Sequence, residues 1–118
     1  MLGVCRLESG TPLPHWLYDS SNFFSLTGTA DETSIVCRED LIPAGFSSEK
    51  GFRAIKVEGP LDFGLIGILA SLLDPLAEAG ISVFVISTYE TDYVLVRQGN
   101  LEKAIRALEA AAFTIRKN

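Results

Sequence analysis

Between residues 53 and 113 the sequence alternates short β-branched segments with segments of helical periodicity, in the order strand, helix, strand, strand, helix. The first of these segments, residues 53–58, alternates apolar and polar side chains, which is typical of a half-buried strand. Apolar residues then recur at helical spacing from Leu65 to Leu76 and from Leu101 to Ala111. This order predicts an α+β unit, with further strands at residues 81–86, 93–97 and 113–115.

Individual residues set the expected ends of these elements. Pro60 ends the first strand, and Asp62 is suited to cap the helix that follows it. Pro75 is expected to bend the last turn of that helix or to end it early, and Gly80 is expected to close it in a left-handed conformation. Asn100 is expected to cap the final helix.

The strand-to-helix corner at residues 59–69 is rich in backbone donors and carries one carboxylate, Asp62. A helix amino terminus presents free N–H groups and the positive end of the helix dipole, which suits the carboxylate of a ligand. Asp62 and Asp92 can supply negative charge for an amino group or a basic side chain. Each feature also has a simpler explanation: Gly64 and Gly67 as packing residues, Asp62 as a helix cap and Asp92 as a turn residue. The corner favours a place that holds a small ligand over a place that breaks bonds.

The first half of the chain resembles the second. Residues 29–38 align with residues 88–97 without a gap, at an offset of about half the chain length, and similar residues follow the same order upstream. This pattern predicts a tandem repeat of two unequal copies, a degenerate half at residues 1–50 and a complete unit at residues 51–118. In the first copy the two helices are expected to be reduced to short segments around residues 15–18 and 40–43, followed by a loop at residues 47–51.

Three segments of the second half resemble the ACT domain. Phe-Gly-Leu-Ile-Gly at residues 63–67 opens a helix, Ala-Gly-Ile-Ser-Val at 79–83 leads into a strand, and Val-Leu-Val-Arg at 94–97 ends one. The run Ile-Ser-Thr-Tyr-Glu-Thr-Asp-Tyr-Val-Leu-Val at 86–96 is more specific. It is similar to small tandem ACT proteins related to a cytosolic arginine sensor and to the regulatory domains of aspartate kinases. The resemblance extends over residues 53–113.

This resemblance implies a ferredoxin-like βαββαβ fold in two unequal tandem copies, with antiparallel sheets and the helices on one face. It also implies that a free amino acid binds where two ACT units meet. The ligand carboxylate is expected at backbone N–H groups near the start of the first helix, and its amino group at a nearby aspartate. The predicted ligand-binding residues are Asp62, Phe63, Gly64, Leu65, Ile66, Ser87, Thr88, Thr91 and Asp92.

Charge and composition argue against several other classes of protein. The net charge of −5 disfavours nucleic-acid binding, which depends on Lys and Arg side chains at phosphates. No apolar run is long enough to span a membrane, and the amino terminus does not resemble a secretion signal, so a cytoplasmic protein is expected. Cys5 and Cys37 are too few for a disulfide framework and are expected to be buried thiols. His15 has no Cys or carboxylate partner at metal-ligand spacing, so a zinc site is not expected. No cofactor is predicted.

No catalytic motif stands out in the sequence, and a small enzyme on a ferredoxin-like frame is the most distant of three hypotheses. The favoured one is a non-catalytic regulatory or sensor module that binds an amino acid. The alternative is a structural or oligomerisation domain without a ligand site. Residues 81–86 are apolar on both faces of the expected strand, which suggests that the first half of the chain or a second copy covers one face. A homodimer is therefore a further expectation.

Overall fold

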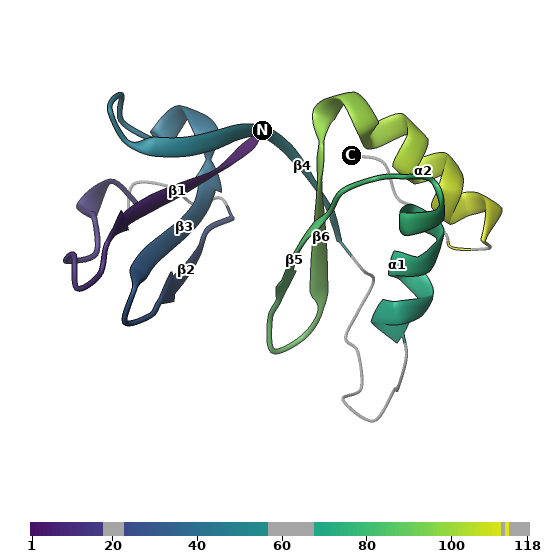
Figure 1. Cartoon of the computed structure of the whole chain (residues 1–118), viewed down its shortest axis with the longest axis horizontal. Helices are drawn as coiled ribbons and strands as arrows, with labels where there is room; N and C mark the ends of the chain where they lie inside the picture. The colour runs from purple at the N-terminus through teal and green to yellow at the C-terminus, as the bar shows by residue number, and fades with distance from the viewer. Residues whose placement is uncertain (18–22, 57–67, 112, 114–118) are drawn as a thin grey trace. The chain divides into compact units, whose positions relative to one another are not determined.

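The computed structural model describes residues 1–17, 23–56, 68–111 and 113. The chain divides into two compact units, Met1–Phe52 and Arg53–Asn118 (Figure 1). Several predicted features lie outside the described residues: the strand-to-helix corner with Pro60 and Asp62, the start of the first helix, and the last two residues of the expected final strand. Phe113, the first residue of that expected strand, is described and is not part of a strand.

The first unit is an antiparallel sheet whose neighbouring strands lie in the order β2-β3-β1-β4. A single 3₁₀ turn follows β1 and another follows β3, at the two places where the sequence predicts reduced helices (Figure 1). The elements are β1 (Leu2–Glu8), η1 (His15–Leu17), β2 (Ser25–Gly28), β3 (Glu32–Arg38), η2 (Glu39–Leu41) and β4 (Ser47–Lys56), which continues into the second unit.

The expectation of a loop at residues 47–51 is wrong, because these residues form the first half of β4. They pair with β1, where Val4 lies opposite Glu49 and Arg6 opposite Ser47. Without this strand, one side of β1 would present backbone N–H and C=O groups with no strand to pair them. The side chains of residues 47–50 are exposed, so no apolar pattern in the sequence marks the strand.

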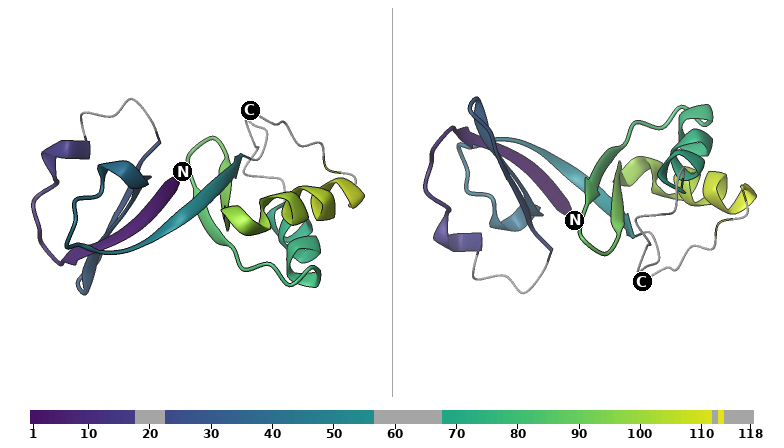
Figure 2. Two further views of the ribbon diagram at one scale, coloured as in Figure 1. Left: turned by 90° about the horizontal axis from the view of Figure 1, so that it is seen from above. Right: turned by 90° about the horizontal axis from the view of Figure 1, so that it is seen from below.

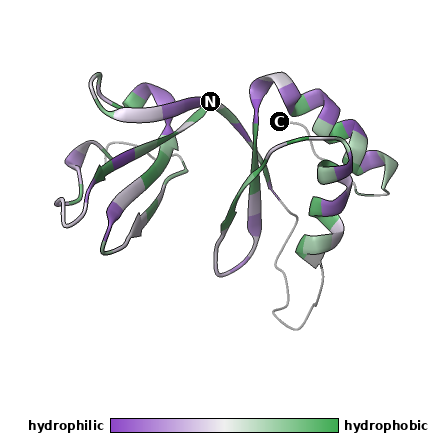
Figure 3. Cartoon of the chain, viewed as in Figure 1, coloured by the Kyte–Doolittle hydropathy of each residue, from purple (hydrophilic) through white to green (hydrophobic). Residues whose placement is uncertain are grey.

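The core of the first unit lies on one face of its sheet. Side chains alternate between buried and more exposed positions along β1, as expected for a strand with one buried face. Figure 3, coloured by hydropathy, shows that both hydrophobic and hydrophilic residues occur along the strands of this unit. Leu17 from η1 and Ile42, which follows η2, cover the strands and are themselves buried. The buried core residues are Cys5, Leu7, Leu17, Ile35, Cys37 and Ile42.

The second unit places two helices against its strands, and β6 lies between β4 and β5. Both helices contribute to one core cluster and lie on the same side of the strands in all views (Figures 1 and 2). The elements after β4 are α1 (Ile68–Glu78), β5 (Phe84–Ser87), β6 (Asp92–Arg97), η3 (Gln98–Asn100) and α2 (Leu101–Ala110). The buried core residues are Ile55, Leu72, Leu76, Ile81, Val94, Val96, Ala104 and Leu108.

Gly80 closes α1 as the sequence predicts, in the left-handed region at φ 73°. The Ile81 N–H donates to the Leu76 carbonyl at 3.0 Å, and the Gly80 N–H donates to the Ala77 carbonyl at 3.0 Å. These two bonds make a Schellman motif, in which Ile81 and Leu76 are both buried in the core. Ile81 therefore belongs to the motif that ends α1. The expectation that a strand begins at residue 81 is wrong, since β5 begins at Phe84.

The structure bears on two expected boundary effects. α1 continues past Pro75 to Glu78, so an early end at Pro75 is wrong, while the alternative of a bent last turn stays a prediction. Asn100 makes no side-chain capping bond and has φ −104° and ψ 0°. Its backbone already belongs to η3, which leads directly into α2 and leaves Asn100 no extended conformation from which to cap.

Candidate functional site

The turn between β5 and β6 brings together four of the predicted ligand-binding residues, Ser87, Thr88, Thr91 and Asp92. The Thr88 N–H donates to the Thr91 carbonyl at 2.8 Å, and the Thr88 hydroxyl donates to the same carbonyl at 3.1 Å. The Thr91 N–H in turn donates to the Thr88 hydroxyl oxygen at 3.2 Å. Thr91 is buried. The Thr88 hydroxyl therefore helps to build the turn.

Ser87 and Asp92 lie directly opposite each other where the two strands enter this turn. The Ser87 hydroxyl donates a hydrogen bond to Oδ1 of the Asp92 carboxylate. Asp92 is partly buried and forms no ion pair within the described part of the chain. A carboxylate can accept about four hydrogen bonds, so Asp92 keeps most of its accepting capacity.

The hairpin of β2 and β3 in the first unit has the same register as that of β5 and β6. Ser25 pairs with Val36 and Phe84 pairs with Leu95, and every pair of the second hairpin lies 59 residues beyond its counterpart in the first. Residues 35–37 are buried in the first hairpin, and residues 94–96 are buried in the second. The alignment of residues 29–38 with 88–97 thus joins residues that occupy equivalent places in the two hairpins.

The two turns also share their hydrogen bonds. The Thr29 N–H donates to the Glu32 carbonyl at 2.9 Å, and the Thr29 hydroxyl donates to the same carbonyl at 3.3 Å. The Glu32 N–H donates to the Thr29 hydroxyl oxygen at 3.1 Å. Thr29 and Glu32 therefore make the same hydrogen bonds in the first turn that Thr88 and Thr91 make in the second. The positions of Ser87 and Asp92 are taken by Gly28 and Thr33.

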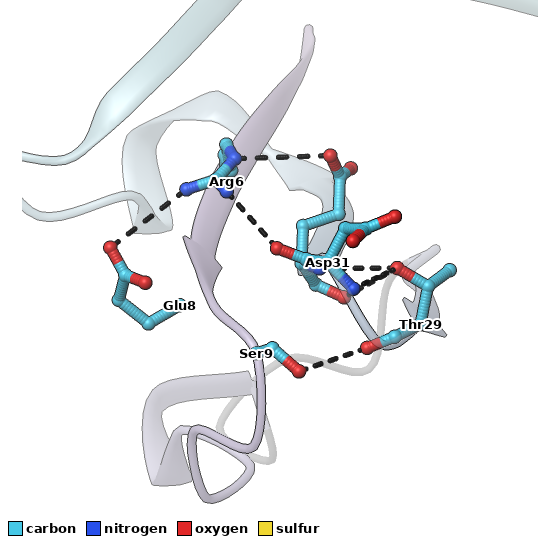
Figure 4. Close-up of polar contacts among 6 residues, drawn as sticks. Arg6, Glu8, Ser9, Thr29 and Asp31 are labelled. Carbon is cyan, nitrogen blue, oxygen red and sulfur yellow. Dashed lines mark hydrogen bonds and ion pairs between the residues drawn. The ribbon is translucent and has the colours of Figure 1, made fainter.

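The first turn lies against a cation of its own unit, Arg6 of β1 (Figure 4). Arg6 Nη2 donates to the Asp31 carbonyl at 3.1 Å, and Arg6 Nε lies 3.8 Å from Glu32 Oε2. Arg6 Nη1 lies 4.0 Å from Glu8 Oε1. These side chains are at least two-fifths exposed, so each ion pair is worth at most about 1 kcal/mol. The sequence did not mark Arg6, because its place beside the turn depends on the register between β1 and β3.

The outer face of the first sheet has an open hollow of about 310 Å³ between β1, β3 and β4. Its lining includes Arg6, Glu32 and Glu49 together with the hydroxyls of Ser34 and Ser47. Small-molecule sites usually bury most of the ligand surface. A ligand in this open hollow would remain largely in water, so we do not take it as the binding site.

The other five predicted residues, Asp62, Phe63, Gly64, Leu65 and Ile66, lie outside the described residues. Their part in a site therefore stays a prediction. The four described candidates are adjacent, as the sequence requires of one short turn. Asp92 is the one charged residue of these four, and its carboxylate forms no ion pair within the described part of the chain.

The two thiols, Cys5 and Cys37, are free and buried. Burial raises the pKa of the Cys37 thiol to about 11, with smaller contributions from Cys5 and Asp40. Burial also raises the pKa of the Cys5 thiol. Within residues 1–17, 23–56, 68–111 and 113, no group of three His, Cys, Asp or Glu side chains is placed to hold a metal ion. Neither helix in the described part of the chain is long and apolar enough to cross a membrane.

Residues 47–110 match the family model of the ACT domain. The chain belongs to the ACT-domain family. A second family model, for an amino-terminal domain, matches residues 1–45. The resemblance seen in the sequence is confirmed, and the fold is ACT-like α+β, with an antiparallel sheet and two helices.

The proteins similar to this ACT protein include one named as a sensor and a bacterial protein of known structure. The Bos taurus cytosolic arginine sensor for mTORC1 subunit 1 is 34% identical over 97 residues, which is 73% of this chain and 30% of the bovine protein. The chain thus spans about a third of the curated relative that it matches. A crystal structure from Agrobacterium tumefaciens is 36% identical, with a TM-score of 0.86, and the match covers 99% of this chain and 91% of that one.

Aspartate kinase from Clostridium acetobutylicum shares the fold, with a TM-score of 0.68. The sequences are 14% identical, and the match covers 93% of this chain and 32% of the kinase. At this identity the likeness concerns the fold alone.

Proposed function

We propose that this chain is a non-catalytic regulatory module that binds a free amino acid in the cytoplasm. The observation that carries the proposal is the ACT match over residues 47–110, together with 34% identity to a protein named a cytosolic arginine sensor. Because the chain spans 30% of that relative, we do not propose that it shares the downstream partner of the relative.

In this proposal the ligand binds where ACT units meet. Its carboxylate accepts from backbone N–H groups near the start of the first helix, and its amino group or basic side chain contacts Asp92. Asp92 supports this role because it is partly buried and its carboxylate has Ser87 as its partner within the described part of the chain. The remaining proposed contacts are Asp62, Phe63, Gly64, Leu65, Ile66, Ser87, Thr88 and Thr91.

The test is a thermal-shift screen of the twenty amino acids at millimolar concentration, beginning with L-arginine, followed by calorimetry of those that bind. Binding to the folded state alone raises the melting temperature. Loss of a charge-assisted contact costs about 1.5–3 kcal/mol, so Asp92→Asn is expected to weaken binding about tenfold to a hundredfold. Asp31→Asn, which neutralises an exposed carboxylate at the first turn, is the matched control and should bind as wild type does.

A screen in which no amino acid shifts the melting temperature or releases heat would favour the structural or oligomerisation alternative. Binding that survives Asp92→Asn unchanged would keep the sensor function and show that the site lies elsewhere.

We include self-association in the proposal. β5 forms an edge of the second unit's sheet, and Phe84 on that strand is 38% exposed. An edge strand presents unpaired backbone groups that a second chain can pair.

A further inference from the structure

The hydrogen bond between Ser87 and Asp92 is not needed to form the turn that it flanks. The first hairpin has the same register, and it closes its turn with the same three bonds around Thr29 and Glu32. It does so with Gly28 and Thr33 in place of the serine and the aspartate. The chain therefore contains its own control, in which the turn is intact and the Ser–Asp pair is absent.

A contribution to the stability of the fold does not explain the Ser87–Asp92 pair either. Asp is disfavoured in strands, and Asp92 is the first residue of β6. Asp92 is a partly buried residue whose carboxylate accepts one exposed hydrogen bond from Ser87, with no cation beside it among the described residues. An exposed hydrogen bond of this kind contributes little to the stability of the fold. The first hairpin, by contrast, places its turn carboxylate Glu32 near the guanidinium of Arg6. A charge that contributes little to the fold is best explained by a partner from outside the chain.

We propose that Ser87 is a positioning residue for the ligand-binding carboxylate of Asp92. The Ser87 hydroxyl occupies Oδ1 and restricts the rotation of the carboxylate, which leaves Oδ2 as the acceptor for the cationic group of the ligand. Fixing the group before binding lowers the entropy lost on binding. Ser87 then lines the site and raises affinity through Asp92, because its hydroxyl donates to Oδ1 of Asp92 and not to the ligand. This inference rests on the proposed function, since it requires that an amino acid binds at Asp92.

The test is a double-mutant cycle of Ser87→Ala and Asp92→Asn, measured by calorimetry. The probe is whichever of the twenty amino acids gives the largest thermal shift with the wild-type chain. Ser87→Ala is expected to weaken binding about threefold to tenfold, and Ser87→Thr, which keeps the hydroxyl, is expected to restore it. Because Ser87 acts through Asp92, the double variant should bind no more weakly than Asp92→Asn alone.

Gly28→Ala is the matched control, since it places the same side chain at the equivalent position of the first hairpin. An added Cβ there meets no atom within 4 Å, and binding should not change. The melting temperature of each variant without ligand separates a structural role from a positioning role.

Three results would overturn the inference while leaving the proposed function in place. These are wild-type affinity in Ser87→Ala, additive losses in the double variant, and a lower melting temperature in Ser87→Ala with unchanged affinity. The absence of binding by any amino acid to the wild-type chain would overturn the proposed function and this inference together.

Discussion

Replacing Gly80 by alanine tests whether backbone conformation alone requires glycine at the end of α1. Gly80 has φ 73°, and a Cβ added there would meet no atom within 4 Å, so steric contact with neighbours contributes nothing. The left-handed conformation costs a residue with a Cβ roughly 1–2 kcal/mol. We expect Gly80→Ala to lower the free energy of unfolding by about 1 kcal/mol and the melting temperature by about 4–8 °C.

Gly99→Ala is the matched control, because its Cβ would also meet no atom within 4 Å and its φ lies outside the left-handed range. Alanine there should be neutral or stabilising by up to about 1 kcal/mol, since it lowers the entropy of the unfolded chain. Gly80→Asn should fall between wild type and Gly80→Ala.

The measurement for these three variants is urea unfolding followed by far-UV circular dichroism, which reports the helices of the second unit. Fluorescence of Trp16, the one tryptophan of the sequence, reports the first unit. Equal stabilities for Gly80→Ala and Gly99→Ala would refute the conformational explanation.

Two further predictions concern the buried thiol and self-association. Because the folded-state pKa of Cys37 is about 11 against an ordinary value of 9.0, its contribution to stability is complete below about pH 9 and is lost as the pH rises toward 11, by about 2–3 kcal/mol. Urea unfolding across that range should show this loss relative to Cys37→Ala, and parallel curves for the two proteins would contradict it. Light scattering at high micromolar concentration should give twice the chain mass of 12.8 kDa, with Phe84→Lys reducing it to one chain; a wild-type mass near 12.8 kDa rejects the dimer.

The sequence was most informative where structure is set by residues close together in the chain. Gly80 signals its left-handed helix end because few other residues adopt that conformation at low cost. The gapless match of residues 29–38 with 88–97 identified two hairpins that prove to have the same register and the same turn bonds. At the candidate site this local information brought Ser87 and Asp92 together, but it did not predict the hydrogen bond between them.

Features that depend on distant pairing could not be predicted. Residues 47–50 have exposed polar side chains, and their strand exists because β1 has backbone groups to pair. Arg6 lies beside the first turn only because β1 and β3 pair in the observed register. Asn100 shows the same limit on a smaller scale, because a 3₁₀ turn before α2 removes the conformation from which it would cap.

The differences between the two units bear on how many ligands one chain can bind. Among the described residues of the first unit, the helical segments are η1 and η2, each of three residues, so neither offers the row of free N–H groups found at the start of a longer helix. Its hairpin turn already lies against Arg6, and it has Gly28 and Thr33 at the positions of Ser87 and Asp92. If the second unit binds through Asp92, calorimetry should therefore give one ligand per chain. Two equivalent sites per chain would show that the turn's backbone, which the two hairpins share, is sufficient for binding.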